Sequence, residues 1–390
     1  MDKYFVNNYK RRPLIVDSSE GSYLIDIEGK KYLDFICGIS INNLGYGNKR
    51  ILDAISKQLP KIIHPSNYYL TQPQIDLAKE LGEASGLSKV FFANSGTESN
   101  EASLQFLSLY NKRFFPDRNE IIVFEGTFLG RTLGSKIAGR GGDIDSLNVK
   151  VAKFNDLQSF YELASSRTLA VHLELVLGHG GIKMFDSEVV QKIAQFCSQN
   201  NILIFIDEVQ TGLGRTGSLF CYQKFNLKPD IVTLGKSLGG GLPLSAMIVS
   251  ERFANVIEQG DYGCTMGGNS LACAAGCEVI SSLQEPDFIK NIAVMSELVA
   301  KKCLLLKDEY TIIKDVRCYG LMCGVEVSDE TAKEIVEKSF NKGLLVDIVN
   351  KNTIRLLPPL TISYREIESA FLTLSDVMKD SQLSDIANIF

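Results

Sequence analysis

Two short, uninterrupted apolar segments near the middle of the chain, Ile202–Ile206 and Ile231–Leu234, constrain the fold more than any other feature. Both are rich in Ile, Val and Leu and show no alternation of polar and apolar residues, which predicts strands buried on both faces of a parallel sheet. Asp207 directly follows the first segment, and Lys236 follows the second after one glycine. Because ligands bind outside the carboxyl ends of parallel strands, we expect this carboxylate and this amine at the same edge of one sheet.

A carboxylate and a lysine at one sheet edge are what a pyridoxal phosphate site requires. The aldehyde of that cofactor binds a lysine covalently, and a carboxylate keeps its ring nitrogen protonated. The spacing alone leaves a second interpretation open, in which Lys236 lies on the surface and Asp207 caps a turn.

The composition narrows the class of partner. The chain has 390 residues, 41 basic and 46 acidic side chains and a net charge of −5, without any block of like charge. These values indicate a globular protein of two or three domains that binds a small molecule rather than nucleic acid. No apolar run approaches the roughly 18 residues of a membrane helix, and the first residues lack the apolar core of a signal peptide. We therefore expect a cytoplasmic protein with no membrane partner.

The nine cysteines and three histidines show no metal-ligand spacing. Cys273 and Cys277 are close in sequence but no third ligand accompanies them, and His64, His172 and His179 form no cluster. Scattered cysteines in odd number indicate a reduced protein. The sequence therefore predicts no metal site.

The order of predicted elements indicates an α/β fold whose mostly parallel sheet carries helices on both faces. Further strands are expected at 90–93, 121–124, 149–154 and 169–173, and helices at 51–59, at 77–84, from residue 97, at 186–198, at 289–306 and at 330–342. After about residue 280 the pattern changes to a smaller α+β lobe, with a strand pair near 312–316 and 321–327. We divide the chain into an N-terminal segment (1–60) packing with the small lobe, a large cofactor-binding domain (61–280) and a C-terminal small domain (281–390).

One polar motif, Ser95-Gly96-Thr97-Glu98, stands between a predicted strand and a predicted helix. The free N–H groups at a helix N-terminus bind a phosphate well, and a glycine lets the anion approach closely. A plain helix cap is the commoner explanation for a single motif of this kind.

The segment Gly212–Gly217 fits the GxGxxG pattern of dinucleotide-binding proteins. That pattern should open a helix directly after a strand, whereas Glu208–Thr211 intervene here. A nicotinamide-dependent oxidoreductase is kept only as a third alternative.

Several long segments together resemble a known family. They are YLDFICGI, VFFANSGTESNEA, FLGRTLG, IDEVQTGLGRTG, PDIVTLGKSLGGGLP, TMGGNSLA and NTIRLLPPL. The chain resembles the class III aminotransferases of fold type I, most of all the N-acetylornithine aminotransferases, from Tyr9 to Leu360. The resemblance implies a homodimeric pyridoxal phosphate enzyme that moves the δ-amino group of N2-acetylornithine, or of another N-acylornithine, to 2-oxoglutarate in arginine biosynthesis. Alternatives are a transaminase of another ω-amine, such as ornithine or 4-aminobutyrate, and a non-catalytic cofactor-binding relative.

The resemblance also assigns cofactor contacts. Lys236 would hold the cofactor and move a proton, and Asp207 would pair with its ring nitrogen. The other cofactor-binding residues would be Gly96 and Thr97 at the phosphate, Phe128 on the ring, Gln210 at the ring hydroxyl, and Thr265 at the phosphate of the partner subunit.

Substrate contacts follow from the same resemblance, with departures. Arg131 and Arg355 would bind substrate carboxylates, although either arginine could instead form a structural salt bridge. Cys264 stands where the family has a hydroxyl that touches substrate, and Leu129 stands where it usually has a histidine. His179 replaces a glutamate that pairs, in relatives, with the equivalent of Arg355. The sequence therefore predicts that Arg355 lacks a carboxylate partner and stays available for the α-carboxylate of glutamate.

Overall fold

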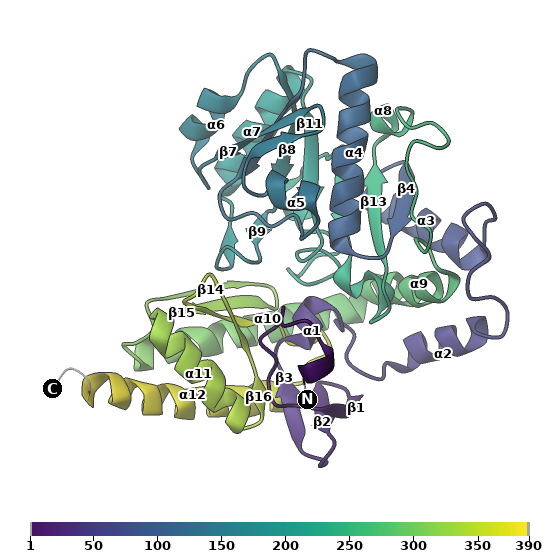
Figure 1. The fold of residues 1–390 in the computed structure, drawn as a ribbon. Coiled ribbons are helices and arrows are strands. Elements are labelled where there is room, and N and C mark those ends of the chain that lie inside the picture. The colour runs from purple at the N-terminus through teal and green to yellow at the C-terminus, as the bar shows by residue number, and fades with distance from the viewer. Residues whose placement is uncertain (1, 388–390) are drawn as a thin grey trace.

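An eight-stranded, mostly parallel sheet forms the centre of the large lobe (Figure 1). The structure is a computed structural model, and it describes residues 2–387. The strand order is β4-β13-β12-β11-β8-β5-β7-β6, in which β13 and β6 run antiparallel to their neighbours. The strands are β4 (Lys89–Ala93), β5 (Glu120–Phe124), β6 (Gly142–Ile144), β7 (Leu147–Ala152), β8 (Thr168–Leu173), β11 (Leu203–Asp207), β12 (Ile231–Leu234) and β13 (Ser245–Val249).

Helices cover both faces of this sheet. Strand β5 illustrates the burial, because Ile122 and Phe124 belong to one hydrophobic cluster whereas Ile121 and Val123 belong to the other. Apolar residues are thus needed at consecutive positions, which explains the uninterrupted runs in the sequence. The helices of this lobe are α3 (Gln72–Ser85), α4 (Gly96–Phe114), α5 (Leu133–Ala138), α6 (Leu157–Leu163), α7 (Ser187–Gln199), α8 (Glu251–Ala254) and α9 (Ser270–Gln284).

A smaller lobe contains a four-stranded antiparallel sheet in the order β14-β15-β18-β17 (Figure 1). Its strands are β14 (Asp315–Tyr319), β15 (Met322–Glu326), β17 (Asp347–Val349) and β18 (Thr353–Leu356), and its helices are α10 (Pro286–Glu309), α11 (Asp329–Asn341) and α12 (Tyr364–Ala387). The N-terminal segment pairs with the C-terminal part of the chain, since β3 (Lys31–Asp34) lies parallel to β16 (Leu344–Leu345). The division into three domains stays a prediction.

The remaining elements are short or peripheral. They are β1 (Val16–Glu20), β2 (Tyr23–Asp26), α1 (Cys37–Ser40), α2 (Lys49–Gln58), β9 (Val176–Leu177), β10 (Lys183–Met184) and the 3-10 helices Asp2–Tyr4, Cys221–Phe225 and Lys236–Gly239. No helix among residues 2–387 is long and apolar enough to cross a membrane.

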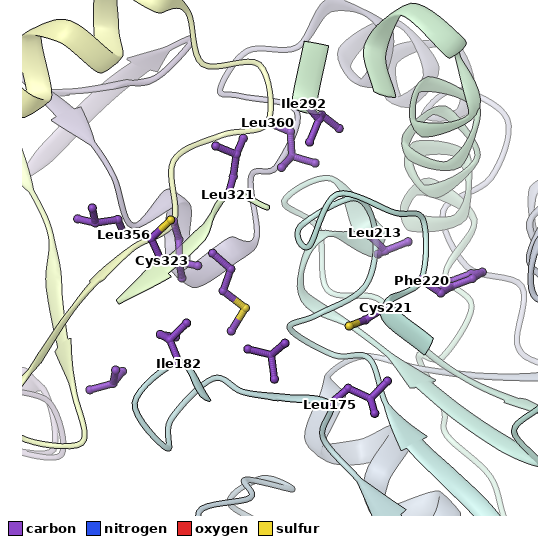
Figure 2. Packing of buried hydrophobic residues seen from close by; sticks show 14 of the residues in the cluster. Leu175, Ile182, Leu213, Phe220, Cys221, Ile292, Leu321, Cys323, Leu356 and Leu360 are labelled. Carbon is purple, nitrogen blue, oxygen red and sulfur yellow. The ribbon is translucent and has the colours of Figure 1, made fainter. Parts of the chain in front are cut away.

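The hydrophobic core continues from one lobe into the other (Figure 2). Leu213 and Phe220 of the large lobe belong to the same cluster as Leu321 and Leu360 of the small lobe. A Cβ atom at Gly214 would lie only 2.8 Å from Leu360 Cδ1. The glycines of the 212–217 segment therefore allow close packing between lobes, and this segment opens no helix of the kind that a dinucleotide site requires.

The fold confirms most predicted elements and adds several others. Strand β12 has the predicted bounds, and Asp186 caps α7 by accepting a hydrogen bond from the N–H of Glu188. The first strand of the C-terminal pair was predicted too early, because α10 extends to Glu309 and β14 begins only at Asp315. Helix α9 and strand β13 are among the elements that the sequence did not predict, since α9 is rich in small buried residues and all five residues of β13 are buried, so neither has a periodic pattern.

Arg215 joins three parts of the fold through a fully buried guanidinium group. Its Nε donates to Ser40 Oγ at 2.9 Å, its Nη1 donates to the carbonyls of Leu321 (2.8 Å) and Pro358 (2.6 Å), and its Nη2 donates to Asn43 Oδ1. All four acceptors are neutral, and burial lowers the pKa of Arg215 to about 10.

Arg215→Met should lower the free energy of unfolding by about 3 kcal/mol, because several buried acceptors would each lose a donor worth roughly 1–3 kcal/mol. Arg118→Met is the matched control, since Arg118 also donates to two backbone carbonyls but does so near the surface. That control should change stability by no more than about 0.5 kcal/mol. Urea denaturation monitored by circular dichroism measures both, and equal effects would contradict the role given to Arg215.

Candidate active site

A cavity of about 280 Å³ opens at the carboxyl ends of β11 and β12. These strands are parallel neighbours, with Asp207 opposite Thr233 in the register, and both Asp207 and Lys236 line the cavity. The structure thus places the carboxylate and the amine at one sheet edge, as predicted. The other walls come from the start of α4, from residues 128–131 after β5, and from Glu174, His179, Val209 and Gln210.

Lys236 is held in an uncommon conformation at this edge. Its φ of +47° lies in the left-handed region, which is unfavourable for a residue other than glycine. Burial lowers the pKa of Lys236 to about 8, although Asp207 and Glu174 act in the opposite direction. The amine therefore loses its proton at a lower pH than an ordinary lysine, which favours the unprotonated form that a nucleophile or proton acceptor needs.

The Asp207 carboxylate is fixed by hydrogen bonds to both of its oxygens. Oδ1 accepts from the N–H of Val209 at 2.8 Å, and Oδ2 accepts from Asn100 Nδ2 at 2.7 Å. His172 Nε2 lies 3.9 Å from Oδ2, but burial lowers the pKa of His172 to about 3, so this imidazole is neutral. Burial raises the pKa of Asp207, which makes the carboxylate a favourable site for a cationic partner.

The N-terminus of α4 comes unusually close to the segment that carries Lys236. A Cβ atom at Gly235 would lie 3.0 Å from the backbone nitrogen of Gly96, and a Cβ atom at Gly96 would lie 2.4 Å from Val209 Cγ1. Both positions therefore require glycine. Thr97 Oγ1 accepts from the N–H of Arg131 at 2.7 Å, which ties the segment after β5 to the same helix end. The N–H of Glu98 donates to the carbonyl of Ser95 at 2.9 Å, whereas Gly96 and Thr97 precede the first hydrogen bond of α4, so this end of the cavity suits an anion.

Two buried polar side chains complete the cavity. Gln210 Oε1 accepts from Arg355 Nη1 at 3.3 Å, while Gln210 Nε2 has no hydrogen-bond partner among the described residues. Such an unpaired donor is costly unless a ligand oxygen accepts from it. Glu174 accepts from the N–H groups of Gly178 (2.8 Å) and Phe128 (3.0 Å), and burial raises the pKa of Glu174 to about 7.

The aromatic ring of Phe128 stacks on the imidazole of His179, with 4.1 Å between ring centroids and 16° between planes. The Arg131 guanidinium lies over the same Phe128 ring at 5.5 Å. Burial, together with the positive charges of Arg355 and Lys236, lowers the pKa of His179 to about 4. His179 is therefore neutral at physiological pH and does not repel its cationic neighbours.

The expectation that Arg355 lacks a carboxylate partner is wrong. Arg355 Nη2 lies 2.6 Å from Asp347 Oδ2, and Arg355 Nε donates to Asp347 Oδ1 at 3.1 Å. The two residues face each other in the β17–β18 ladder, so strand register creates the pair. Nη1 also donates to the carbonyl of Gly178 at 3.2 Å. Asp347 thus provides the carboxylate that His179 cannot supply.

Two predicted contacts do not line this cavity. Cys264 is half-buried, and its Sγ lies 3.1 Å from Asn94 Nδ2, while Thr265 is exposed. Three residues that do shape the site, Asn100, Glu174 and Asp347, were not predicted. Glu174 is a polar residue in an apolar run, which is a weak sequence signal, whereas Asn100 lies in a polar segment and Asp347 depends on strand register.

The family model of the class-III aminotransferases matches residues 4–378. The chain belongs to this family. It is 38% identical to the acetylornithine aminotransferase of Caldanaerobacter subterraneus subsp. tengcongensis, over 97% of this chain and 98% of that protein. The corresponding enzyme of Clostridium acetobutylicum is 40% identical over 96% and 99% of the two chains.

The fold agrees with that of solved members of the family. The crystal structure of N-acetylornithine aminotransferase from Stenotrophomonas maltophilia K279a superposes with a TM-score of 0.84 at 28% identity, covering 95% of this chain and 97% of that one. The fold is therefore that of the fold type I aminotransferases, and the enzyme depends on pyridoxal phosphate.

The residues of the cavity fit this cofactor. The orphaned Nε2 of Gln210 offers a donor to a ring oxygen, and the N-terminus of α4, where Gly96 and Thr97 line the cavity, suits a phosphate. Lys236 offers a partly unprotonated amine, and Asp207 offers a fixed carboxylate to a ring nitrogen.

Asp207→Asn should lower the pKa of Lys236 further below about 8, because the carboxylate charge raises that pKa. The pH dependence of Lys236 acetylation in cofactor-free protein, read by mass spectrometry, measures this midpoint, with the exposed Lys228 as an internal standard. A wild-type midpoint near the ordinary lysine value of about 10.4, or a midpoint unchanged by the substitution, would contradict the electrostatic account.

Proposed function

We propose that the enzyme transfers the δ-amino group of N2-acetylornithine, or of another N-acylornithine, to 2-oxoglutarate, as a cytoplasmic step of arginine biosynthesis. The observation that carries the proposal is the buried amine of Lys236 beside Asp207 in one cavity. The choice of substrate is supported by the acetylornithine aminotransferases that share 38–40% identity with the chain over nearly its full length.

Each residue of the cavity then has a defined task. Bound pyridoxal phosphate supplies the electron-withdrawing ring that allows an amino group to leave one substrate and enter another. Lys236 Nζ would hold the cofactor and then carry a proton to and from the substrate carbon that bears the amino group. Asp207 would keep the ring nitrogen protonated, and Gln210 Nε2 would donate to the ring oxygen. The first-turn N–H groups of Gly96 and Thr97 would hold the phosphate.

The proposal extends to a homodimer. Thr265 is exposed and lies outside the cavity of its own chain, in a loop rich in glycine. In a homodimer, the Thr265 hydroxyl of each subunit would reach the phosphate in the active site of the other subunit. Cys264 would approach the substrate of that neighbouring site in the same way.

Lys236→Ala should abolish glutamate formation from N-acetylornithine and 2-oxoglutarate while leaving the circular dichroism spectrum unchanged. Lys228→Ala, an exposed lysine of the same lobe, should retain wild-type activity. Ornithine and 4-aminobutyrate serve as competing donors in the same assay, and N-acetylornithine should have the highest kcat/KM. A higher value for either competitor would overturn the substrate proposal, and an active Lys236→Ala variant would overturn the site.

The Arg355–Asp347 pair generates a prediction about the acceptor. An arginine that binds the α-carboxylate of 2-oxoglutarate must first leave Asp347, so the two carboxylates compete. Asp347→Asn removes the competing charge and should tighten 2-oxoglutarate binding about tenfold, which corresponds to about 1.4 kcal/mol.

The matched control is Asp376→Asn, because Asp376 pairs with Lys342 on the surface. Titration of each protein with 2-oxoglutarate measures the dissociation constant. Weaker or unchanged binding in Asp347→Asn would mean that Asp347 positions Arg355 rather than competing for it.

His179→Glu should change the dissociation constant of 2-oxoglutarate less in the wild-type background than in the Asp347→Asn background. The reason is that the new glutamate would add a second carboxylate to an arginine that already has one in Asp347.

A further inference from the structure

Three cysteine sulfur atoms meet in the small lobe, away from the cavity described above. Cys303 of α10, Cys318 of β14 and Cys323 of β15 place their Sγ atoms within 4.8 Å of one another. The sequence predicted no metal site: Cys318 and Cys323 have a C-x4-C spacing that zinc sites also use, but the third cysteine lies on a separate helix. Only the packing of a helix against a strand pair brings them together.

The β14–β15 hairpin fixes two of the three sulfurs. Cys318 and Cys323 are opposite each other in the antiparallel ladder. The turn contains Gly320 with a φ of +62°, and a Cβ atom there would lie 2.5 Å from the backbone of Thr216. The hairpin is therefore held against the large lobe, which leaves its cysteines little freedom to separate.

Helix α10 brings the third sulfur from the other side. Cys303 and Cys323 are fully buried, whereas Cys318 is partly exposed. The group is thus closed on the sides of Cys303 and Cys323, and the partly exposed Cys318 is the side from which an ion could enter and a water molecule could complete its coordination.

We propose that Cys303, Cys318 and Cys323 bind one thiophilic divalent cation of the zinc class. The group consists of three sulfurs without histidine or carboxylate, and thiolate ligands select soft metals such as zinc over magnesium or calcium. A zinc ion with three protein ligands keeps its fourth position for water. Binding of one divalent cation by three thiols releases three protons and leaves one net negative charge.

Arg215 is placed to offset that charge. Its guanidinium is fully buried, donates to the carbonyl of Leu321 two residues before Cys323, and has only neutral acceptors among its hydrogen bonds in the described residues. A buried cation without an anionic partner is costly. An anionic metal–thiolate group beside Cys323 would supply the missing counter-charge.

The site lies behind the substrate-binding strand rather than in the catalytic cavity. In the β15–β18 ladder, Cys323 is opposite Leu356 and Gly324 is opposite Arg355. Successive side chains of a strand point to opposite faces, so Cys323 and Leu356 share the core face (Figure 2). A bound cation would join α10, β14 and β15 and stabilise the lobe that carries Arg355, without touching cofactor or substrate.

The test uses reduced, chelator-treated holoenzyme titrated with Zn²⁺ against a chromophoric competitor, and with Co²⁺ for its sulfur-to-metal absorption band. Wild-type protein should bind one Zn²⁺ per chain, release protons and unfold at a higher temperature when loaded. Cys318→Ser should weaken binding by at least about 100-fold, since even outer-shell substitutions cost 10–100-fold. Cys277 is a half-buried cysteine of α9 outside the group. Cys277→Ser should therefore leave the zinc stoichiometry, the proton release and the rise in unfolding temperature unchanged.

If Cys318→Ser does not fold, X-ray absorption of zinc-loaded wild-type protein decides, with three sulfur ligands expected at about 2.3 Å. Reduced wild-type protein that takes up no Zn²⁺, or zinc bound through nitrogen and oxygen only, would show that the three thiols are core packing. Uptake that is equal in Cys318→Ser and wild-type protein would also overturn the proposal.

Discussion

The close approach of two backbone segments at Gly96 and Gly235 determines the rest of the active site. With only 3.0 Å between a Cβ position at 235 and the nitrogen of residue 96, a side chain at 235 would push the N-terminus of α4 away from β12, and a Cβ atom at 96 would lie 2.4 Å from Val209 Cγ1. The anion-binding end of that helix would then lose its place beside Lys236. Asn100, one turn further along α4, would also no longer reach Asp207. One backbone contact thus sets the separation between the N-terminus of α4, the amine of Lys236 and the carboxylate of Asp207.

Electrostatics inside the cavity follow from its burial. Desolvation lowers the pKa of Lys236, His179 and His172 and raises that of Asp207 and Glu174, so each group is shifted toward its neutral form. Arg355 keeps a carboxylate partner in Asp347 instead. Position 179 carries a histidine, and the carboxylate that holds Arg355 comes instead from Asp347 on the neighbouring strand of the small lobe.

Residues adjacent in sequence to predicted strands could be placed from the sequence alone. Asp207 and Lys236 follow apolar runs that are unmistakable, and their meeting requires only parallel strands. Asp347 could not be found this way, because its contact with Arg355 depends on the register of β17 against β18. The cluster of Cys303, Cys318 and Cys323 could not be predicted for a similar reason, since only the packing of a helix against a hairpin brings the three sulfur atoms together. Local patterns thus predicted the elements, whereas contacts between the elements of the small lobe needed the structure.

The central claim is that Lys236 holds the cofactor at the edge of the large sheet. Borohydride reduction of the yellow holoenzyme, followed by proteolysis and mass spectrometry, tests it most directly. The account predicts that the cofactor's mass is added to the peptide that contains Lys236 and to no other peptide. An adduct on a different lysine, or none in a protein that holds stoichiometric cofactor, would contradict it.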